Sequence, residues 1–373
     1  MDAKHVYVHV PFCARRCSYC DFAIAVRRIV PVDEYLDALD REIRIRVGDS
    51  RPALIDTIYL GGGTPSRLGP DGVRRVLDIV RARFPQSPGV DVTVEANPED
   101  VSPDAASRWR DAGVTRVSLG IQSFNDDVLK WMHRTHDASQ ARQAAATLKD
   151  AGFDDWSLDL IFALPPEVER SWTEDLNQAI DLGSTHISCY GLTVEPHTPL
   201  LRWRERGQVH EADEDRYEAE FLEADRLLTT AGFEHYEVSN YARPNRRAVH
   251  NSAYWQRVSY VGFGPSAHSF SSGAHRRWNA REYVAWRDQV LAGRDPVEET
   301  ETLEPASVAI EEAYLGLRTS TGIPINPANA SDFNLWRDRG WAVVVDHMGR
   351  LTPSGWLRLD SLVAGLTDVR SRY

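Results

Sequence analysis

The sequence predicts an α/β protein whose main part is a partial, TIM-like (β/α)6 barrel, followed by a small winged-helix-like α+β domain. Two observations support this prediction. Strand-like and helix-like segments alternate from the start of the chain, and polar motifs follow several of the strand-like runs. Such alternation favours a parallel sheet covered by helices. Six strand–helix units are too few for a closed eight-stranded barrel, so we expect a partial one.

The elements of the barrel are predicted from apolar runs and the turn residues that bound them. The expected strands are Val6–Val10, Leu54–Leu60, Val90–Glu95, Thr115–Ile121, Trp156–Phe162 and His186–Leu192. The expected helices between them are Val32–Val47, Asp71–Phe84, Pro103–Asp111, Ser139–Ala151 and Trp172–Asp181.

The second half of the chain is less regular. A helix is expected over Glu211–Ala231, whereas Tyr236–Asn279 is rich in Gly, Ser, Asn and aromatic residues and predicts a long ordered loop. The charged stretch Val297–Ser307 is typical of a linker, and Val308–Thr319 is expected to be helical. The pattern of "GWAVVVDHMGRLTPSGWLRLDSLVAGL" then predicts a hairpin and a helix. We therefore expect a barrel over 1–235, a ligand-side loop and barrel extension over 236–300, and a C-terminal domain over 301–373.

The composition indicates a cytoplasmic protein. The formal net charge of −12 argues against nucleic acid or an anionic membrane as the main partner. The first residues, "MDAKHVYVHVPFC", lack the apolar core of a signal peptide, and no apolar run approaches the ~18 residues of a membrane span. In the cytosol a dense cysteine cluster is expected to bind metal or to act in catalysis, because disulfides are rare there.

Three of the four cysteines, Cys13, Cys17 and Cys20, lie within eight residues. Thiolates are preferred ligands of iron–sulfur clusters and of zinc. Three thiolates can each bind one iron of a [4Fe–4S] cluster and leave the fourth iron open to a small molecule. The alternative is a zinc site in which His5 or His9 supplies the fourth ligand.

Polar motifs at the ends of the predicted strands indicate one shared site. "GGGTPS" follows the second strand, "EANPED" and "GIQSF" end the next two, and "DLIFALPP" spans the fifth. In α/β folds the carboxyl ends of the strands form the active face. Asp159 lies inside an apolar run, where a carboxylate is costly unless it is paired. Glu95 ends its strand and could accept hydrogen bonds from a ligand or serve a structural role.

These motifs resemble those of the radical S-adenosylmethionine (SAM) superfamily. Within it, "YVHVPFC", "GGGTPS", "VEANP", "VSLGIQSF", "DLIFALP" and "LTVEPHTPL" resemble the oxygen-independent coproporphyrinogen III oxidase family, through nearly the whole chain. The resemblance implies that Cys13, Cys17 and Cys20 hold a [4Fe–4S] cluster. It also implies that the open iron binds the amino and carboxylate groups of SAM.

The resemblance assigns further residues to SAM. Tyr7 and Tyr19 would pack near the adenosine, and a side chain on the glycine-rich turn would block the approach of the backbone to the methionyl end. Glu95 would accept from ribose hydroxyls or pair with a cationic group. A second SAM site is described in the family, and Arg134 could also be a surface charge. The implied SAM residues are Tyr7, Tyr19, Gly62, Gly63, Thr64, Glu95, Gln122, Arg134 and Asp159.

Two departures separate this chain from the oxidase branch of the family. That branch has an N-terminal extension and a cysteine two residues after the third ligand, whereas here six residues precede Tyr7 and position 22 is Phe22. The stretch "VHNSAYWQ" fits the HNxxYW motif of the family's heme-chaperone branch. A neutral imidazole is a common axial ligand of heme iron, so His250 is a candidate heme ligand. The alternative is a histidine in a polar network beside Trp255.

The resemblance therefore implies a heme chaperone that binds heme and transfers it to an acceptor protein, on a core that holds the cluster and SAM. The main alternative is an oxygen-independent coproporphyrinogen III oxidase. An RNA-modifying radical SAM enzyme is disfavoured by the acidic balance. Still open are the acceptor, covalent or axial heme attachment, SAM cleavage, the number of SAM molecules, and the oligomeric state, with a homodimer as one alternative.

Overall fold

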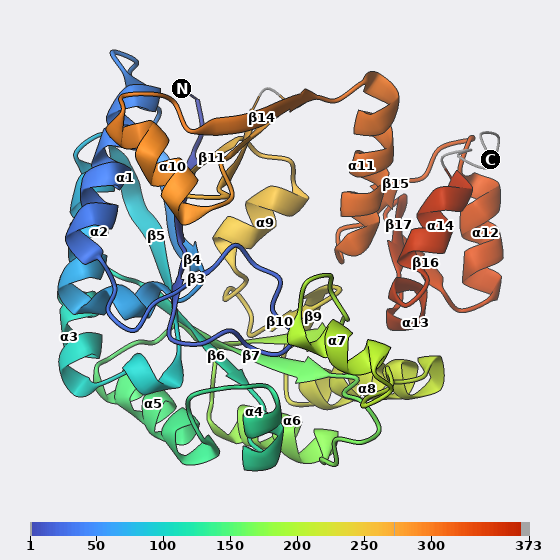
Figure 1. Cartoon of the computed structure of the whole chain (residues 1–373). Helices are drawn as coiled ribbons and strands as arrows, with labels where there is room; N and C mark the ends of the chain where they lie inside the picture. Colours follow the sequence, from blue (N-terminus) through green and yellow to red (C-terminus); the bar gives the residue numbers. More distant parts are fainter. Residues whose placement is uncertain (1, 272, 367–373) are drawn as a thin grey trace.

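The computed structural model describes residues 2–271 and 273–366 and places most strands in one large curved sheet (Figure 1). The order across this sheet is β14-β13-β12-β11-β1-β4-β5-β6-β7-β8-β10-β9. Its strands are β1 His5–Val10, β4 Ile55–Gly62, β5 Gln86–Ala96, β6 Arg116–Gln122, β7 Trp156–Phe162, β8 His186–Gly191, β9 Glu234–Glu237, β10 Asn240–Ala242, β11 Tyr260–Phe263, β12 His268–Ser271, β13 His275–Asn279 and β14 Val297–Thr302.

The middle of the sheet is parallel from β11 through β8, which confirms the α/β fold with a partial barrel core. All six predicted strands are present. The parallel run has one further member, β11, which pairs with β1 on the side opposite β4. This strand has four residues inside a glycine-rich and aromatic stretch, so its sequence shows no clear periodicity. The antiparallel strands β12–β14 and β10–β9 extend the sheet at its two ends.

Helices on the outside of the sheet cover it with their apolar faces. Several begin with a side-chain cap, such as Ser102 before α3 and Ser171 before α6, which fixes their first residue. The helices of this part are α1 Val32–Val47, α2 Gly69–Arg81, α3 Pro103–Asp111, α4 Asp126–Trp131, α5 Ala138–Asp150, α6 Trp172–Asp181, α7 Pro199–Glu205, α8 Glu214–Thr230, α9 Val249–Trp255 and α10 Tyr283–Leu291.

Two expectations for the second half of the barrel region are wrong. The segment Tyr236–Asn279 is not one long loop, because it contains the second half of β9, then β10, α9 and β11–β13. The first part of the predicted linker, Val297–Thr302, is strand β14. Its exposed side chains are mostly acidic, and Glu301 lies opposite Arg276 of β13. An edge strand that faces solvent and carries such charged pairs is as polar as a linker, which is why its sequence suggests one.

The C-terminal part has its own three-stranded sheet, in the order β15-β17-β16, which Figure 1 shows beside the barrel. The predicted hairpin and the helix after it are present, and both are preceded by α11. The elements are α11 Pro305–Arg318, β15 Ile323–Pro324, α12 Ala330–Asp338, β16 Ala342–Val345, β17 Met348–Leu351, α13 Pro353–Trp356 and α14 Leu359–Leu366. The division into three domains stays a prediction, since the large sheet continues past residue 235.

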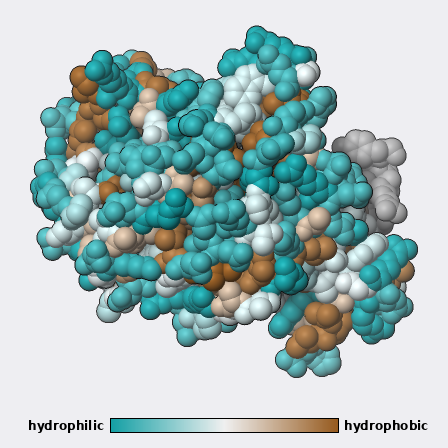
Figure 2. Space-filling model, turned by 90° about the horizontal axis from the view of Figure 1, so that it is seen from below, coloured by the Kyte–Doolittle hydropathy of each residue, from teal (hydrophilic) through white to brown (hydrophobic). Residues whose placement is uncertain are grey.

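The surface is largely polar on the face that Figure 2 shows, with hydrophobic residues in small separate patches. Among the described residues, no helix has both the length and the apolar character needed to cross a membrane.

Candidate functional site

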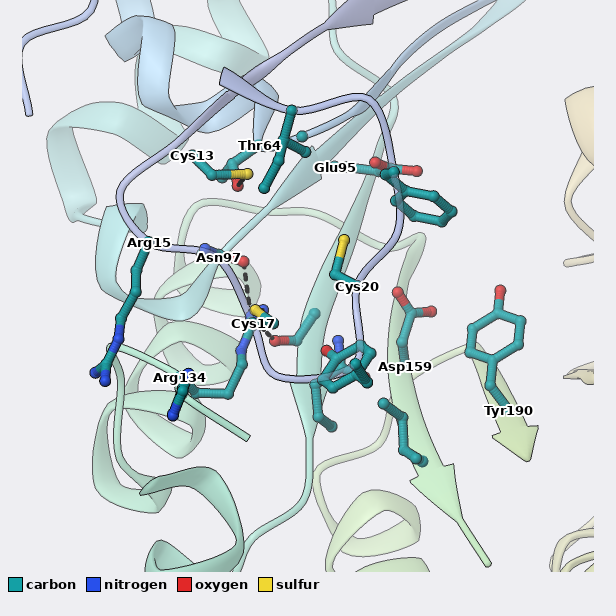
Figure 3. A pocket seen from close by; sticks show the side chains of 18 of the residues that line it. Cys13, Arg15, Cys17, Cys20, Thr64, Glu95, Asn97, Arg134, Asp159 and Tyr190 are labelled. Carbon is teal, nitrogen blue, oxygen red and sulfur yellow. Dashed lines mark hydrogen bonds between the residues drawn. The ribbon is translucent and has the colours of Figure 1, made fainter. Parts of the chain in front are cut away.

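A cavity of about 370 Å³ lies at the carboxyl ends of strands β4–β8, under the loop that carries the three cysteines (Figure 3). The polar motifs after the strands meet here, as the strand-end argument predicts. The predicted residues that line the cavity are Cys13, Cys17, Tyr19, Cys20, Gly62, Gly63, Thr64, Glu95, Gln122, Arg134 and Asp159. Two predicted residues, Tyr7 and His250, are not among those that line it.

The three thiols point into this cavity from one short loop (Figure 3). The loop is closed by the pairing of β2 Phe12–Cys13 with β3 Ala25–Val26. All three cysteines are free of disulfides, and burial raises the pKa of the Cys13 thiol and raises that of Cys20 to about 12. Three half-buried thiols around one space are a donor set suited to an iron–sulfur cluster, whose positively charged iron would favour their deprotonation.

The histidines of the zinc alternative are engaged elsewhere. The Nε2 atom of His9 lies 2.9 Å from the carbonyl oxygen of Ala23, and its Nδ1 lies 3.0 Å from the hydroxyl of Tyr7. His5 Nδ1 lies 2.9 Å from Thr57 Oγ1. Neither ring lines the cavity. Within the described residues, no group of three His, Cys, Asp or Glu side chains is arranged to hold a single metal ion. His9 instead holds the cysteine loop against β1.

The glycine-rich turn packs against the cysteine loop. A Cβ atom on Gly62, whose φ is +111°, would lie 2.5 Å from the ring of His9. A Cβ atom on Gly63 would lie 2.7 Å from the carbonyl group of Pro11. The resemblance implies that these glycines let the backbone approach a ligand, and both line the cavity. In addition, they make room for the protein's own chain. Thr64 Oγ1 then lies 3.5 Å from Cys13 Sγ.

Two carboxylates face the cavity, and burial is the main cause that raises the pKa of each (Figure 3). The pKa of Glu95 is raised to about 7, although Glu95 accepts hydrogen bonds from the Tyr59 hydroxyl at 2.7 Å and from Gly62 N at 3.1 Å. The pKa of Asp159 is raised to about 6, while its hydrogen bond with Ser188 and the charge of Arg134 act in the opposite direction. Both groups therefore titrate near neutral pH.

Arg134 is part of the cavity wall and not a surface charge. Its guanidinium donates to Asn97 Oδ1 at 2.7 Å and to the carbonyl oxygen of Gly120 at 2.6 Å, and it lies 3.5 Å from Cys17 Sγ. Gln122 follows at a shift in the β6–β7 register and has a left-handed φ of 73°. A glutamine rarely adopts a left-handed backbone conformation. Such strained residues and register shifts cluster at functional strand ends.

Tyr19 and Tyr7 differ in their surroundings. Tyr19 lines the cavity and packs against an apolar cluster that includes Val128 and Met132. The resemblance implies that Tyr7 packs near the adenosine, but Tyr7 lies in the middle of β1, where its ring stacks on Tyr59. The strand continues to Val10 and therefore places Tyr7 below the cavity, not in its wall.

His250 lies on α9 in the interior of the barrel and is 2% exposed. Its Nδ1 lies 2.6 Å from Thr57 Oγ1, and its Nε2 lies 2.7 Å from the hydroxyl of Tyr254. Burial lowers the pKa of His250 to about 3, so the imidazole is neutral at physiological pH. The polar-network alternative thus describes the ring as it stands in this structure.

Several lining residues escaped the sequence argument, among them Asn97, Ser118 and Tyr190. Tyr190 could have been found from strand alternation. It follows Ser188 by two residues, and Ser188 pairs with Asp159 across β7 and β8. Asn97 carries no such signal, because it lies in the turn after β5 and is oriented by Arg134.

The fold and the cavity together define a protein of the radical SAM class, and comparison with known proteins agrees. The model of the Radical SAM superfamily matches residues 7–179. The solved structure of coproporphyrinogen III oxidase (HemN) from Escherichia coli superposes with a TM-score of 0.82 over 99% of this chain and 91% of that chain. Their sequences are 21% identical, so this likeness shows a shared fold.

Curated relatives identify the family more closely. Heme chaperone HemW of Mycobacterium tuberculosis is 36% identical over 95% of this chain and 92% of its own length. The proteins of the same name from Bacillus subtilis and Escherichia coli are 34% and 38% identical, over 86% and 70% of this chain and 84% and 69% of their own lengths. The chain belongs to the HemW heme chaperone family within the radical SAM superfamily.

Proposed function

We propose that this protein binds heme and passes it to an acceptor protein in the cytoplasm, on a core that holds a [4Fe–4S] cluster and SAM. The observation that carries the proposal is the 36% identity to a curated heme chaperone along 95% of the chain.

The cavity residues support the cofactor part. Cys13, Cys17 and Cys20 would hold the cluster, since their thiols face one space and none is in a disulfide. Glu95 and Asp159 would accept hydrogen bonds from SAM and balance its positive charge. Tyr19 would border the adenosine, and Gln122 and Arg134 would contact SAM in the same cavity. When bound, the cluster and SAM supply the capacity for reductive cleavage, which the protein directs by positioning.

His250 remains the proposed heme ligand, and the structure specifies what ligation requires. Both ring nitrogens have hydrogen-bond partners, so binding to iron would replace the contact with either Thr57 or Tyr254. The α9 helix also carries Trp255, whose ring lies under the guanidinium of Arg318 at 4.4 Å. We therefore expect heme binding at His250 to shift α9 away from the barrel interior.

Titration with hemin tests the proposal. Anaerobically reconstituted protein should bind hemin stoichiometrically in absorption spectra, and His250→Ala should weaken binding about 10-fold or more, because an axial ligand is lost. The matched control is His275→Ala, which removes an exposed histidine on β13 and should leave binding unchanged. A wild-type protein that does not bind hemin contradicts the chaperone role, whereas equal binding by His250→Ala removes only this ligand.

The oxidase alternative is tested on the same preparation. Cluster-loaded protein incubated anaerobically with SAM, reductant and coproporphyrinogen III should form no protoporphyrinogen. Clear turnover would replace the chaperone role by that of an oxygen-independent coproporphyrinogen III oxidase.

A further inference from the structure

Three aromatic rings form a layer across the barrel interior, directly below the cavity. The ring layer consists of Tyr7 from β1, Tyr59 from β4 and His250 from α9. Tyr59 is stacked on His250 with ring centroids 5.1 Å apart, and on Tyr7 with centroids 6.1 Å apart. The centroids of Tyr7 and His250 are 6.4 Å apart. Each ring therefore limits where the other two can lie.

The ring layer is connected to the cavity through Glu95. The hydroxyl of Tyr59 donates to Glu95 Oε1 at 2.7 Å, and the other carboxylate oxygen accepts from Gly62 N at 3.1 Å. Glu95 lines the cavity together with the cysteine loop. The direction in which this carboxylate faces the cavity thus depends on the position of the Tyr59 ring.

His250 is held from both sides. Thr57 Oγ1 lies between His250 Nδ1 at 2.6 Å and His5 Nδ1 at 2.9 Å, so it can donate to one ring and accept from the other. The hydroxyl of Tyr254 contacts His250 Nε2 at 2.7 Å. A neutral imidazole offers one donor and one acceptor, and these contacts use both. The ring is therefore fixed in the plane that Tyr59 stacks on.

We propose that His250 is a positioning residue for the SAM site: held by Thr57 and Tyr254, it supports Tyr59, which directs Glu95 into the cavity. The inference rests on the SAM-binding part of the proposed function and is independent of heme ligation. It has a consequence for the chaperone. Any ligand that withdraws His250 from the ring layer weakens SAM binding, and by linkage SAM weakens the binding of that ligand by the same factor.

The test measures SAM affinity and the electron paramagnetic resonance spectrum of the reduced cluster with and without SAM. His250→Ala should weaken SAM binding about 3- to 10-fold, since the stacked ring that supports Tyr59 is lost. The double variant His250→Phe with Tyr254→Phe keeps a flat ring under Tyr59. It also removes the hydroxyl at position 254, which would otherwise lose its hydrogen-bond partner. It should bind SAM within about 2-fold of the wild type, although phenylalanine cannot ligate iron.

Two further variants keep the result interpretable. Tyr59→Phe retains the ring but removes the donor to Glu95, so it should weaken SAM binding even if His250→Ala fails to fold. Tyr260→Phe is the matched control. Its ring packs on Tyr254, and its hydroxyl takes no part in the hydrogen bonds that hold His250.

The outcomes separate the two proposals. If cluster-loaded wild-type protein does not bind SAM, the SAM part of the proposed function fails. If the wild type binds SAM and both His250→Ala and Tyr59→Phe bind it equally well, His250 has no positioning role and the inference is overturned. Equal loss in the alanine and double-phenylalanine variants would also overturn it, because the flat ring would then have no effect.

Discussion

At the scale of single residues, Glu95 and Asp159 give the cavity a charge that depends on pH. Burial raises the pKa of Glu95 to about 7 and that of Asp159 to about 6, and repulsion from Asp159 adds to the raised pKa of Glu95. Arg134 and the Tyr59 hydroxyl act in the opposite direction. The cavity of the ligand-free protein thus becomes more negative as the pH rises through the neutral range.

We predict that SAM affinity rises with pH. SAM carries a positive sulfonium group, so ionised carboxylates attract it, and each carboxylate that loses its proton strengthens binding. Affinity should increase about 10-fold between about pH 5.5 and pH 8, which corresponds to about 1.4 kcal/mol. Calorimetry across this range measures the affinity. In the Glu95→Gln variant, we expect the affinity to change less with pH near pH 7. Affinity that is constant or falls with pH would contradict the assignment of these carboxylates.

At the scale of elements, the cysteine loop is held in place by main-chain contacts. The amide of Ala25 donates to the carbonyl of Pro11 at 2.7 Å, and that of Gly63 donates to the carbonyl of Val10 at 2.8 Å. Main-chain hydrogen bonds thus join the two ends of the cysteine loop to each other and the glycine-rich turn to β1. Phe22 follows the third thiol and is 62% exposed at the cavity rim, a position at which a cysteine would be open to solvent.

Gly63→Ala should disturb these contacts. The added Cβ atom would lie 2.7 Å from the Pro11 carbonyl, which belongs to the backbone and cannot turn away. We expect a loss of about 1–3 kcal/mol in the free energy of unfolding, as for other overpacked sites. Iron content after reconstitution should also fall. Gly365→Ala is the control, because nothing lies within 4 Å of its Cβ position and alanine favours helices. Unchanged stability and iron content in Gly63→Ala would refute the role of this contact.

The sequence predicts elements best where local signals mark their ends. The predicted bounds of α1, α3, α6 and β7 match the structure, and capping serines precede α3 and α6. The position of β11 and the direction of His250 were not predictable. The partner of β11 lies in β1, at the other end of the barrel sequence, and His250 meets Thr57 across 193 residues. Such long-range contacts form only in the complete tertiary structure and leave no periodic pattern in the sequence.

At the scale of the whole molecule, Glu42 connects helix α1 of the barrel to the region of strands β11–β13 and helix α10. This buried carboxylate on α1 accepts from Gly264 N at 2.7 Å, Asn279 Nδ2 at 2.6 Å and Trp286 Nε1 at 2.9 Å. It also pairs with Arg46 at 2.9 Å. The donors come from β13, from α10 and from the turn after β11, so one side chain joins several separate segments.

Glu42→Ala should therefore destabilise the whole protein. Removing one partner of a buried ion pair costs about 3–5 kcal/mol, because the remaining donors lose their acceptor without gaining water. The matched control is Asp37→Ala on the exposed side of the same helix, which should change the free energy of unfolding by about 0.5 kcal/mol or less. Chemical denaturation of both variants measures the difference. Equal stability of the two variants would show that the region of strands β11–β13 and helix α10 is held by packing alone.

The parallel pairing of β1 with both β11 and β4 has a consequence for the stability of the proposed [4Fe–4S] cluster. The cysteine loop emerges from a strand with neighbours on each side, so its root needs no iron to stay in place. We expect oxygen to strip the iron while the scaffold persists, and repair to need only fresh iron and sulfide, with no new round of folding.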